Sequence, residues 1–447
     1  MAQAIDTGLV RGIRRWDLVA VAINGIIGAG IFGLPSKIYS LTGAYSLIAF
    51  LLCALVVTLI IFCFAEAGSR FSDTGGPYLY ARAAFGPVVG FEVGWLMWLA
   101  RLTGFAANCN LLVGYLSYFW PAASSGWWRT GIITAIVVFL TAVNIVGVRN
   151  AAMVSNLFTV GKLIPIMLFI AAGLFFIDPR QFSFATQPSH SALSTSVMLL
   201  VYAFSGFEMA VIPAGEVRDP RRNLPLAILT AIAVVSLLYI LIQVVCIGTL
   251  PGLAGSERPL ADASRQFLGA AGASVITAGA LISIIGNLNV LVLAGSRLPF
   301  AMAGRGELPQ IVSKTHRRFR TPHAAILLTA AVMLVLTLSG TFIYALTIST
   351  IARLLAYAVT CAALPILRRR SAERPALFQV PAGVAVSGAA LALIVWLLSN
   401  ITWREARDAG MAAVCGVIIY FVYRLRKRGE PSGKVVEAAN PAQRDSF

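Results

Sequence analysis

Apolar segments long enough to cross a bilayer follow one another along almost the whole chain. A helix needs about 20 mostly apolar residues to span the hydrocarbon core, and backbone polar groups cannot stay unpaired there. Hydropathy therefore predicts an all-α integral membrane protein with about twelve transmembrane helices. The expected ranges are 17–38, 44–66, 88–118, 130–148, 153–177, 194–216, 224–250, 272–302, 323–340, 343–366, 380–399 and 409–424.

Composition supports this interpretation and leaves no room for a soluble domain. Of the 447 residues, 58% are hydrophobic and only 12% are charged, whereas a soluble domain carries about 25% charged residues. We expect a short cytoplasmic N-terminal segment (1–16), one transmembrane domain (17–424) and a polar tail (425–447). The composition of the tail predicts disorder.

The formal net charge of +17 is explained by topology rather than by nucleic-acid binding. Lys and Arg concentrate in alternate loops, beginning with Arg11, Arg14 and Arg15 before the first span. Cytoplasmic loops carry such an excess, so both termini are expected in the cytoplasm of a plasma (inner) membrane protein. The bilayer is then the expected macromolecular partner, and the sequence carries no signal for an oligomeric state.

Cysteine and histidine patterns give no support for a metal, a cofactor or an enzyme. The cysteines all fall inside apolar runs, and none has zinc-site spacing. His190, His316 and His323 are scattered in expected loops. An enzyme acting on a lipid-linked substrate would need a nucleophile and a base at motif spacing, which these residues do not provide.

Two expected spans contain residues that disfavour a continuous helix. The first has Gly25, Gly28, Ala29 and Gly30 near its middle, and glycine costs a helix about 1 kcal/mol relative to alanine. This run indicates either an unwound segment that approaches a ligand or close helix–helix packing. The sixth span contains Tyr202 to Glu208, with Ser205, Gly206 and a carboxylate at mid-span.

Glu208 and Lys162 are ionisable residues inside expected spans, where charges are costly and usually functional. Glu208 could instead be a structural polar residue, or it could favour cationic substrates or hold a second proton. Lys162 could extend to the interface. Alternatively, burial disfavours its charged form, so that it could load and release a proton. The sequence gives no role to Arg101 or Glu92 in the third span.

The two interruptions lie five spans apart, and an odd offset inverts topology. The chain is therefore expected to contain inverted repeats at about 17–177 and 194–366, with two extra helices at about 380–424. Interrupted helices at matching positions of two repeats indicate a transporter site. Half-helix N-termini suit an anion and half-helix C-termini suit a cation, so a zwitterionic amino acid is the expected substrate.

Several motifs resemble the amino acid–polyamine–organocation (APC) superfamily of permeases over nearly the whole chain. The resemblance implies the leucine-transporter-type fold, with a 5+5 inverted repeat and two added helices. The motifs are Gly25-Ile26-Ile27-Gly28-Ala29-Gly30-Ile31-Phe32 with Pro35, Gly114-Tyr115-Leu116-Ser117-Tyr118-Phe119, Phe204-Ser205-Gly206-Phe207-Glu208 and Gly215-Glu216-Val217-Arg218-Asp219-Pro220-Arg221-Arg222-Asn223-Leu224-Pro225.

The resemblance also implies roles for the interrupted segments. N–H groups around Ala29 and Gly30 would hold a substrate carboxylate. The carbonyls of Ile26, Tyr202 and Ser205 would hold its α-ammonium group.

Three further residues take roles from the same resemblance. Phe204 and Phe207 would border the side-chain pocket. Lys162 matches the fifth-span lysine of proton-coupled relatives, whose ammonium group stands where sodium-coupled relatives bind sodium.

Two features depart from the related arginine/agmatine antiporters. No aromatic residue occurs between Ala271 and Leu298 to stack on a guanidinium, and Ser283, Asn287 and Asn289 are available instead. Ala29 also replaces a hydroxyl residue found in some relatives. We therefore expect proton-coupled amino acid symport by alternating access, with amino acid or amine exchange as the alternative. Two interrupted helices disfavour a channel.

Overall fold

The fold is described from a computed structural model that covers residues 13–72, 75–146, 151–212, 214, 217–319, 321–370 and 375–429. Residues 1–12 of the expected N-terminal segment (1–16) and residues 430–447 of the expected disordered tail (425–447) lie outside these residues, as do Gly215 and Glu216 of the motif above. Residues 425–429 of the expected tail are helical. Within the described ranges the chain is helical. The only extended pairing there is an isolated parallel bridge between Ile13 and Val217, in which the Arg218 N–H donates to the Ile13 carbonyl at 3.0 Å.

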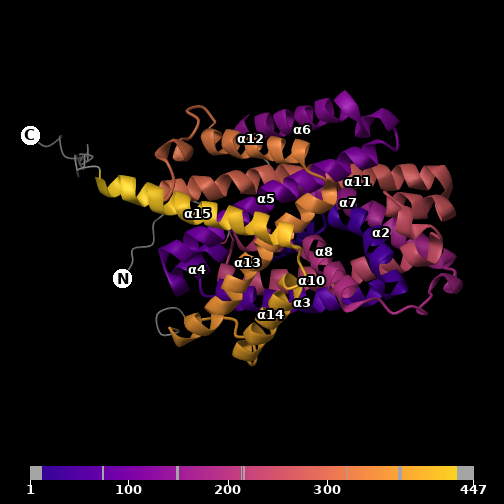
Figure 1. Cartoon of the computed structure of the whole chain (residues 1–447), viewed down its shortest axis with the longest axis horizontal. Helices are drawn as coiled ribbons and strands as arrows, with labels where there is room; N and C mark the ends of the chain where they lie inside the picture. Colours follow the sequence, from indigo (N-terminus) through magenta and orange to yellow (C-terminus); the bar gives the residue numbers. More distant parts are fainter. Residues whose placement is uncertain are drawn as a thin grey trace, which may run out of the picture.

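Apart from α4, which was not predicted, the helices overlap the expected apolar ranges, and many of them run roughly along the long axis of the molecule (Figure 1). Between 15 and 249 they are α1 (Arg15–Ile26), α2 (Gly30–Thr42), α3 (Ser46–Gly68), α4 (Pro77–Phe85), α5 (Pro87–Leu116), α6 (Gly126–Val146), α7 (Ala151–Gly173), α8 (His190–Phe204), α9 (Glu208–Val211) and α10 (Pro220–Thr249). They continue with α11 (Pro259–Gly304), α12 (His323–Ser339), α13 (Phe342–Arg369), α14 (Gly383–Leu398) and α15 (Trp403–Gly429).

Length and composition qualify many of these helices as membrane spans. Among the described residues, eight helical stretches are long and apolar enough to cross a bilayer. Three shorter apolar helices, at Gly161–Phe176, His323–Ser339 and Gly383–Leu398, accompany them. The molecule is therefore a multi-pass membrane protein with an all-helical fold.

Both predicted interruptions are present in the backbone. The first expected span is divided into α1 and α2, with Ile27, Gly28 and Ala29 between them. The sixth is divided into α8 and α9, with Ser205, Gly206 and Phe207 between them. Glycine and serine near mid-span thus mark the places where helical hydrogen bonding stops.

The long helix α5 lies at the centre of the bundle and packs against α4, α11, α12, α13 and α15. Its start is fixed by Gly86, whose φ of 91° is readily available only to glycine, and by Pro87 in the first turn. Most of α5 is buried, including Arg101 and Asn108. This helix therefore carries polar groups into the interior beside both interruptions.

Two clusters of charged residues hold the end of the bundle at which α4 lies. At the first, Glu66 of α3 accepts from Arg368 Nε at 2.8 Å and Nη2 at 2.6 Å, and from the Val380 N–H at 2.9 Å. At the second, Glu307 pairs with Arg82 of α4. We call the first group the Glu66 cluster.

Candidate substrate site between two interrupted helices

The two interrupted helices are in direct backbone contact at Gly25 and Gly206. A Cβ atom built on Gly25 would lie 2.6 Å from the Gly206 carbonyl oxygen. Gly206 has a φ of 111°, and a Cβ on it would collide with the Gly25 carbonyl oxygen. Unwinding and close packing, the two interpretations that the sequence left open, therefore occur together.

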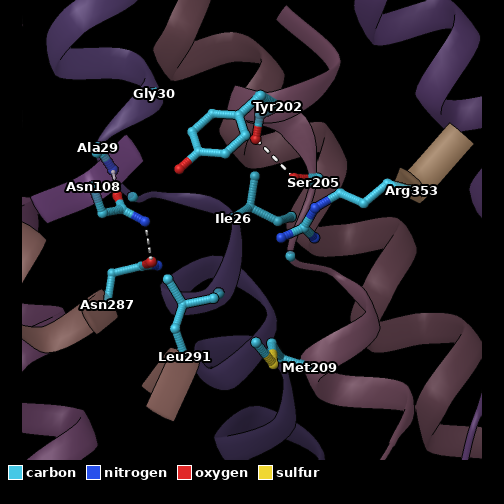
Figure 2. A pocket seen from close by; sticks show the side chains of 13 residues that line it. Ile26, Ala29, Gly30, Asn108, Tyr202, Ser205, Met209, Asn287, Leu291 and Arg353 are labelled. Atoms are coloured by element: carbon cyan, nitrogen blue, oxygen red, sulfur yellow. Dashed lines mark hydrogen bonds between the residues drawn. The ribbon is translucent and has the colours of Figure 1, made fainter. Parts of the chain in front are cut away.

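A cavity opens beside this contact, and both interrupted segments line it (Figure 2). Seven of the residues predicted from the sequence form part of its wall: Ile26, Gly28, Ala29, Gly30, Tyr202, Ser205 and Gly206. The rest of the wall comes mainly from other helices: Gly25, Asn108, Met209, Asn287, Leu291 and Arg353. The cavity thus has contributions from α1, α2, α5, α8, α9, α11 and α13.

The N-terminus of α2 gives one side of the cavity its hydrogen-bond donors. The Ala29 N–H donates to Asn108 Oδ1 at 3.2 Å, and Asn108 Nδ2 donates in turn to Asn287 Oδ1 at 3.1 Å. The first N–H groups of a helix have no partner inside that helix, and the helix dipole makes this end positive. This side of the cavity is therefore suited to an anion.

Backbone carbonyl groups at the ends of α1 and α8 provide acceptors. The Tyr202 carbonyl accepts from Ser205 Oγ at 2.7 Å. The Tyr239 hydroxyl lies 3.1 Å from both the Ile26 and the Ala203 carbonyl oxygens, so one side chain of α10 joins the two interrupted helices. Each carbonyl oxygen has two lone pairs, and it can accept a second donor such as a substrate ammonium group.

A buried ion pair borders the cavity at α13. Arg353 pairs with Glu208, and the two side chains are 5% and 0% exposed. The same carboxylate accepts from the Gly206 N–H at 2.8 Å and from the Tyr357 hydroxyl at 3.0 Å. Glu208 itself is not part of the cavity wall. Its contacts fix the second interruption, whereas the Arg353 side chain reaches into the cavity (Figure 2).

Lys162 lies deep in the protein, next to the first interruption. Its side chain is fully buried, and Nζ donates to the carbonyls of Asn24 at 2.9 Å and Ile27 at 2.7 Å. The alternative in which Lys162 extends to the membrane interface is therefore wrong. The ammonium group instead stands at the C-terminal end of α1, where the helix dipole favours a positive charge.

Phe204 and Phe207 are buried, but they are not among the residues that line the cavity. The Phe204 ring packs on Tyr239, with 5.0 Å between ring centroids. The Phe207 ring packs on Phe64 and Tyr357, at 5.1 and 5.3 Å. Both rings therefore pack against neighbouring helices on the side of the second interruption away from the cavity.

Four residues of the cavity wall were not predicted from the sequence: Asn108, Met209, Leu291 and Arg353. Polar residues inside a span are a functional signal, and this signal was available for Asn108 and Arg353. Which spans meet at the interruptions is a matter of packing, however, and hydropathy does not contain it. Asn287, noted as a polar replacement for an aromatic residue, does line the cavity.

The two unassigned charges of the third span lie outside the cavity wall. Arg101 is fully buried and contacts Met209, which lines the cavity. Glu92 lies beside α15, where a Cβ on Gly416 would be 2.8 Å from its Oε2. Among the described residues, no group of three or more His, Cys, Asp or Glu side chains is placed to hold a metal ion.

Comparison with known proteins identifies similar chains that align over nearly their whole length. A family model described as amino acid permease matches residues 13–422. The methylthioribose transporter of Bacillus subtilis is 28% identical over 444 residues, covering 94% of this chain and 95% of the relative. From the same organism, the serine/threonine exchanger SteT is 28% identical (94% and 99% covered). The branched-chain amino acid permease BcaP is 24% identical (94% and 94% covered).

Proposed function

This chain belongs to the amino acid permease family, and we propose that it moves a zwitterionic amino acid across the plasma membrane by alternating access. The family consists of transporters rather than enzymes. One observation carries the proposal: the N-terminus of α2 and the carbonyl-bearing ends of α1 and α8 face a single cavity. A positive and a negative helix end then meet one ligand that carries both charges.

The substrate is oriented by these two helix ends. Its carboxylate accepts from the N–H groups around Ala29 and Gly30, next to Asn108. Its α-ammonium group donates to the carbonyls of Ile26, Tyr202 and Ser205. Because Gly25 contacts Gly206, the N–H groups of the first interruption and the carbonyl groups of the second lie close enough to bind one small molecule.

Lys162 couples transport to protons in this proposal. Its ammonium group bonds two carbonyls at the first interruption, and loss of the proton would remove the positive charge that holds α7 to α1. Substrate and proton would then be released on the same side. Such coupling requires the affinity for substrate to differ between the two protonation states of Lys162.

The topology proposed with this function has twelve spans. Helices α1 to α7 form the first repeat and α8 to α13 the second, inverted repeat, with α4 as a connecting helix. Helices α14 and α15 pack on the outside, α14 against α13 and α3 and α15 against α5. Both termini are placed in the cytoplasm, because the loops on that side carry the excess of Lys and Arg.

Exchange is the second candidate, and the relative named serine/threonine exchanger favours it. An exchanger with the same site would swap one amino acid for another without net proton flux. Lys162 would then be a fixed structural cation.

The deciding experiment is uptake of a labelled amino-acid panel into proteoliposomes, either empty or preloaded with amino acid, with and without an inward proton gradient. We expect uptake into empty vesicles that the gradient stimulates. Uptake only into preloaded vesicles would identify an exchanger. Absence of uptake and of counterflow across the panel would contradict amino acid transport itself.

A further inference from the structure

From the charges around the cavity, we infer that the substrate is an amino acid whose side chain carries a second carboxylate. This inference rests on the proposed function and specifies its substrate class. The guanidinium group of Arg353 lines the cavity, and that of Arg101 contacts Met209 of the cavity wall. Among the described residues, the only carboxylate paired with either of them belongs to Glu208.

Arg353 is the cation that meets the substrate directly. It lines the cavity, and its side chain enters from the wall opposite Asn108 and Asn287 (Figure 2). A Cβ built on Gly104 would lie 3.6 Å from Arg353 Nη2 and 3.8 Å from Tyr202 Cε2. The guanidinium group therefore sits beside the ring of Tyr202, on a different wall from the α2 N-terminus.

Glu208 neutralises only one of the two guanidinium groups. One carboxylate oxygen pairs with Arg353, and the other accepts from the Gly206 N–H and the Tyr357 hydroxyl. This acid is therefore engaged in fixing the second interruption.

Arg101 is left without a carboxylate partner in the part of the chain that the structure describes. It is fully buried, and its hydrogen bonds go to the Met97 carbonyl at 3.1 Å and to Met209 Sδ at 3.8 Å. Its Nε atom has no partner. The cluster formed by Arg101, Arg353 and Glu208 thus contains two guanidinium groups and one carboxylate. Arginine remains protonated at neutral pH, so the cluster keeps one positive charge in excess.

An excess buried charge is costly in an interior of low dielectric, and an anion placed in the cavity would offset this cost. The α-carboxylate and α-ammonium groups of the substrate cancel each other at the interruptions. A side-chain carboxylate would therefore supply the missing negative charge. A cationic side chain would add a second uncompensated charge to the same region.

The experiment compares glutamate and aspartate with their amides, which have nearly the same shape and no side-chain charge. Competition against a labelled substrate and ligand-induced shifts of the unfolding temperature are both measured. We expect the acids to bind at least tenfold more tightly than the amides, since a hydrogen bond between two charged groups is stronger than one to a neutral amide.

Two substitutions test the residues themselves. Arg353→Gln should reduce the preference for acid over amide about tenfold. Arg101→Gln should also reduce this preference. Arg353→Gln removes the cation that pairs with Glu208 and could misfold for that reason, whereas Arg101→Gln leaves the Glu208 pair intact. The second variant therefore tests the inference even if the first one misfolds. Arg369→Gln, on an exposed position of the same helix α13, is the matched control and should leave the preference unchanged.

The outcomes separate this inference from the function on which it rests. If neutral amino acids are transported and the amides bind as well as the acids, the acidic specificity is wrong and amino acid transport stands. If both arginine variants keep the wild-type preference, the two guanidinium groups do not select the substrate. If neither acids nor neutral amino acids bind, the proposed function fails as well.

Discussion

At the scale of single residues, the site depends on two positions that have room only for a hydrogen atom. Gly206 adopts a φ of 111°, where other residues are strained. Its α-carbon also faces the Gly25 carbonyl. The backbone of one interrupted helix therefore fits directly against the backbone of the other.

We predict that Gly206→Ala lowers the unfolding temperature of the detergent-solubilised protein and abolishes transport, because the new Cβ would collide with Gly25 and the positive φ would be strained. The combined cost should be at least about 2 kcal/mol. Gly114→Ala in α5 is the control. No atom lies within 4 Å of a Cβ at that position, so this change should leave stability unchanged or raise it. Equal behaviour of the two variants would contradict the close contact.

A second residue-scale prediction concerns Lys162. Lys162→Ala removes the ammonium group that bonds the Asn24 and Ile27 carbonyls, so accumulation driven by a proton gradient should disappear. The ratio of uptake at acidic to neutral external pH should fall to about one. Lys314→Ala, in the loop between α11 and α12, is the control and should accumulate substrate normally. Unchanged pH-driven accumulation in the Lys162 variant would exclude the coupling role.

At the scale of elements, the Glu66 cluster ties α3 to α13 and to the segment before α14. Arg368 binds Glu66 with two nitrogen atoms, and Arg70 adds a third contact at 3.1 Å. Glu66 is fully buried, and removing its charge would take away the carboxylate that Arg70 and Arg368 share. Breaking a buried ion pair in this way typically costs about 3 kcal/mol.

We therefore expect Glu66→Gln to lower the unfolding temperature by several degrees, measured by thermal unfolding followed by fluorescence-detection size-exclusion chromatography. Glu257→Gln, at an exposed loop position, should have no measurable effect. If the two variants unfold at the same temperature, the cluster does not hold these elements together.

The sequence predicted the positions of the helices better than it predicted which helices pack against one another. Apolar length located every helix except the short α4, and Gly28 and Gly206 located the interruptions, because both signals are local. Placing Asn108 and Arg353 at the cavity required knowing that α5 and α13 pack beside α1 and α8. This follows from long-range packing and has no counterpart in hydropathy. The same limit explains why Phe204 and Phe207 were expected at the pocket and instead pack behind it.

At the scale of the whole molecule, the distribution of basic residues supports the proposed orientation in the membrane. The end of the bundle that holds α4 and the C-terminus of α15 lies at the left in Figure 1. It also carries Arg305, which lies over the Tyr78 ring of α4, and Arg370, which donates to the Ala83 carbonyl of α4. An excess of Lys and Arg marks the cytoplasmic side.

A reporter fused to the C-terminus tests this orientation. Green fluorescent protein placed there should fluoresce, and alkaline phosphatase placed there should be inactive. The same reporters fused after Gly255, in the loop between α10 and α11, should give the opposite result. Active phosphatase at the C-terminus would reverse the proposed topology.

The position of Lys162 has a consequence for how a transporter of this kind can change its coupling ion. Its ammonium group bonds the Ile27 carbonyl, and the preceding residue, Ile26, lines the cavity. The Lys162 ammonium group and the substrate would then bind to neighbouring peptide units. Proton binding and substrate binding would be coupled directly, without conformational changes transmitted through the rest of the bundle. Replacing the Lys162 side chain of α7 alone would then change the coupling ion, while the substrate-binding residues stayed unchanged.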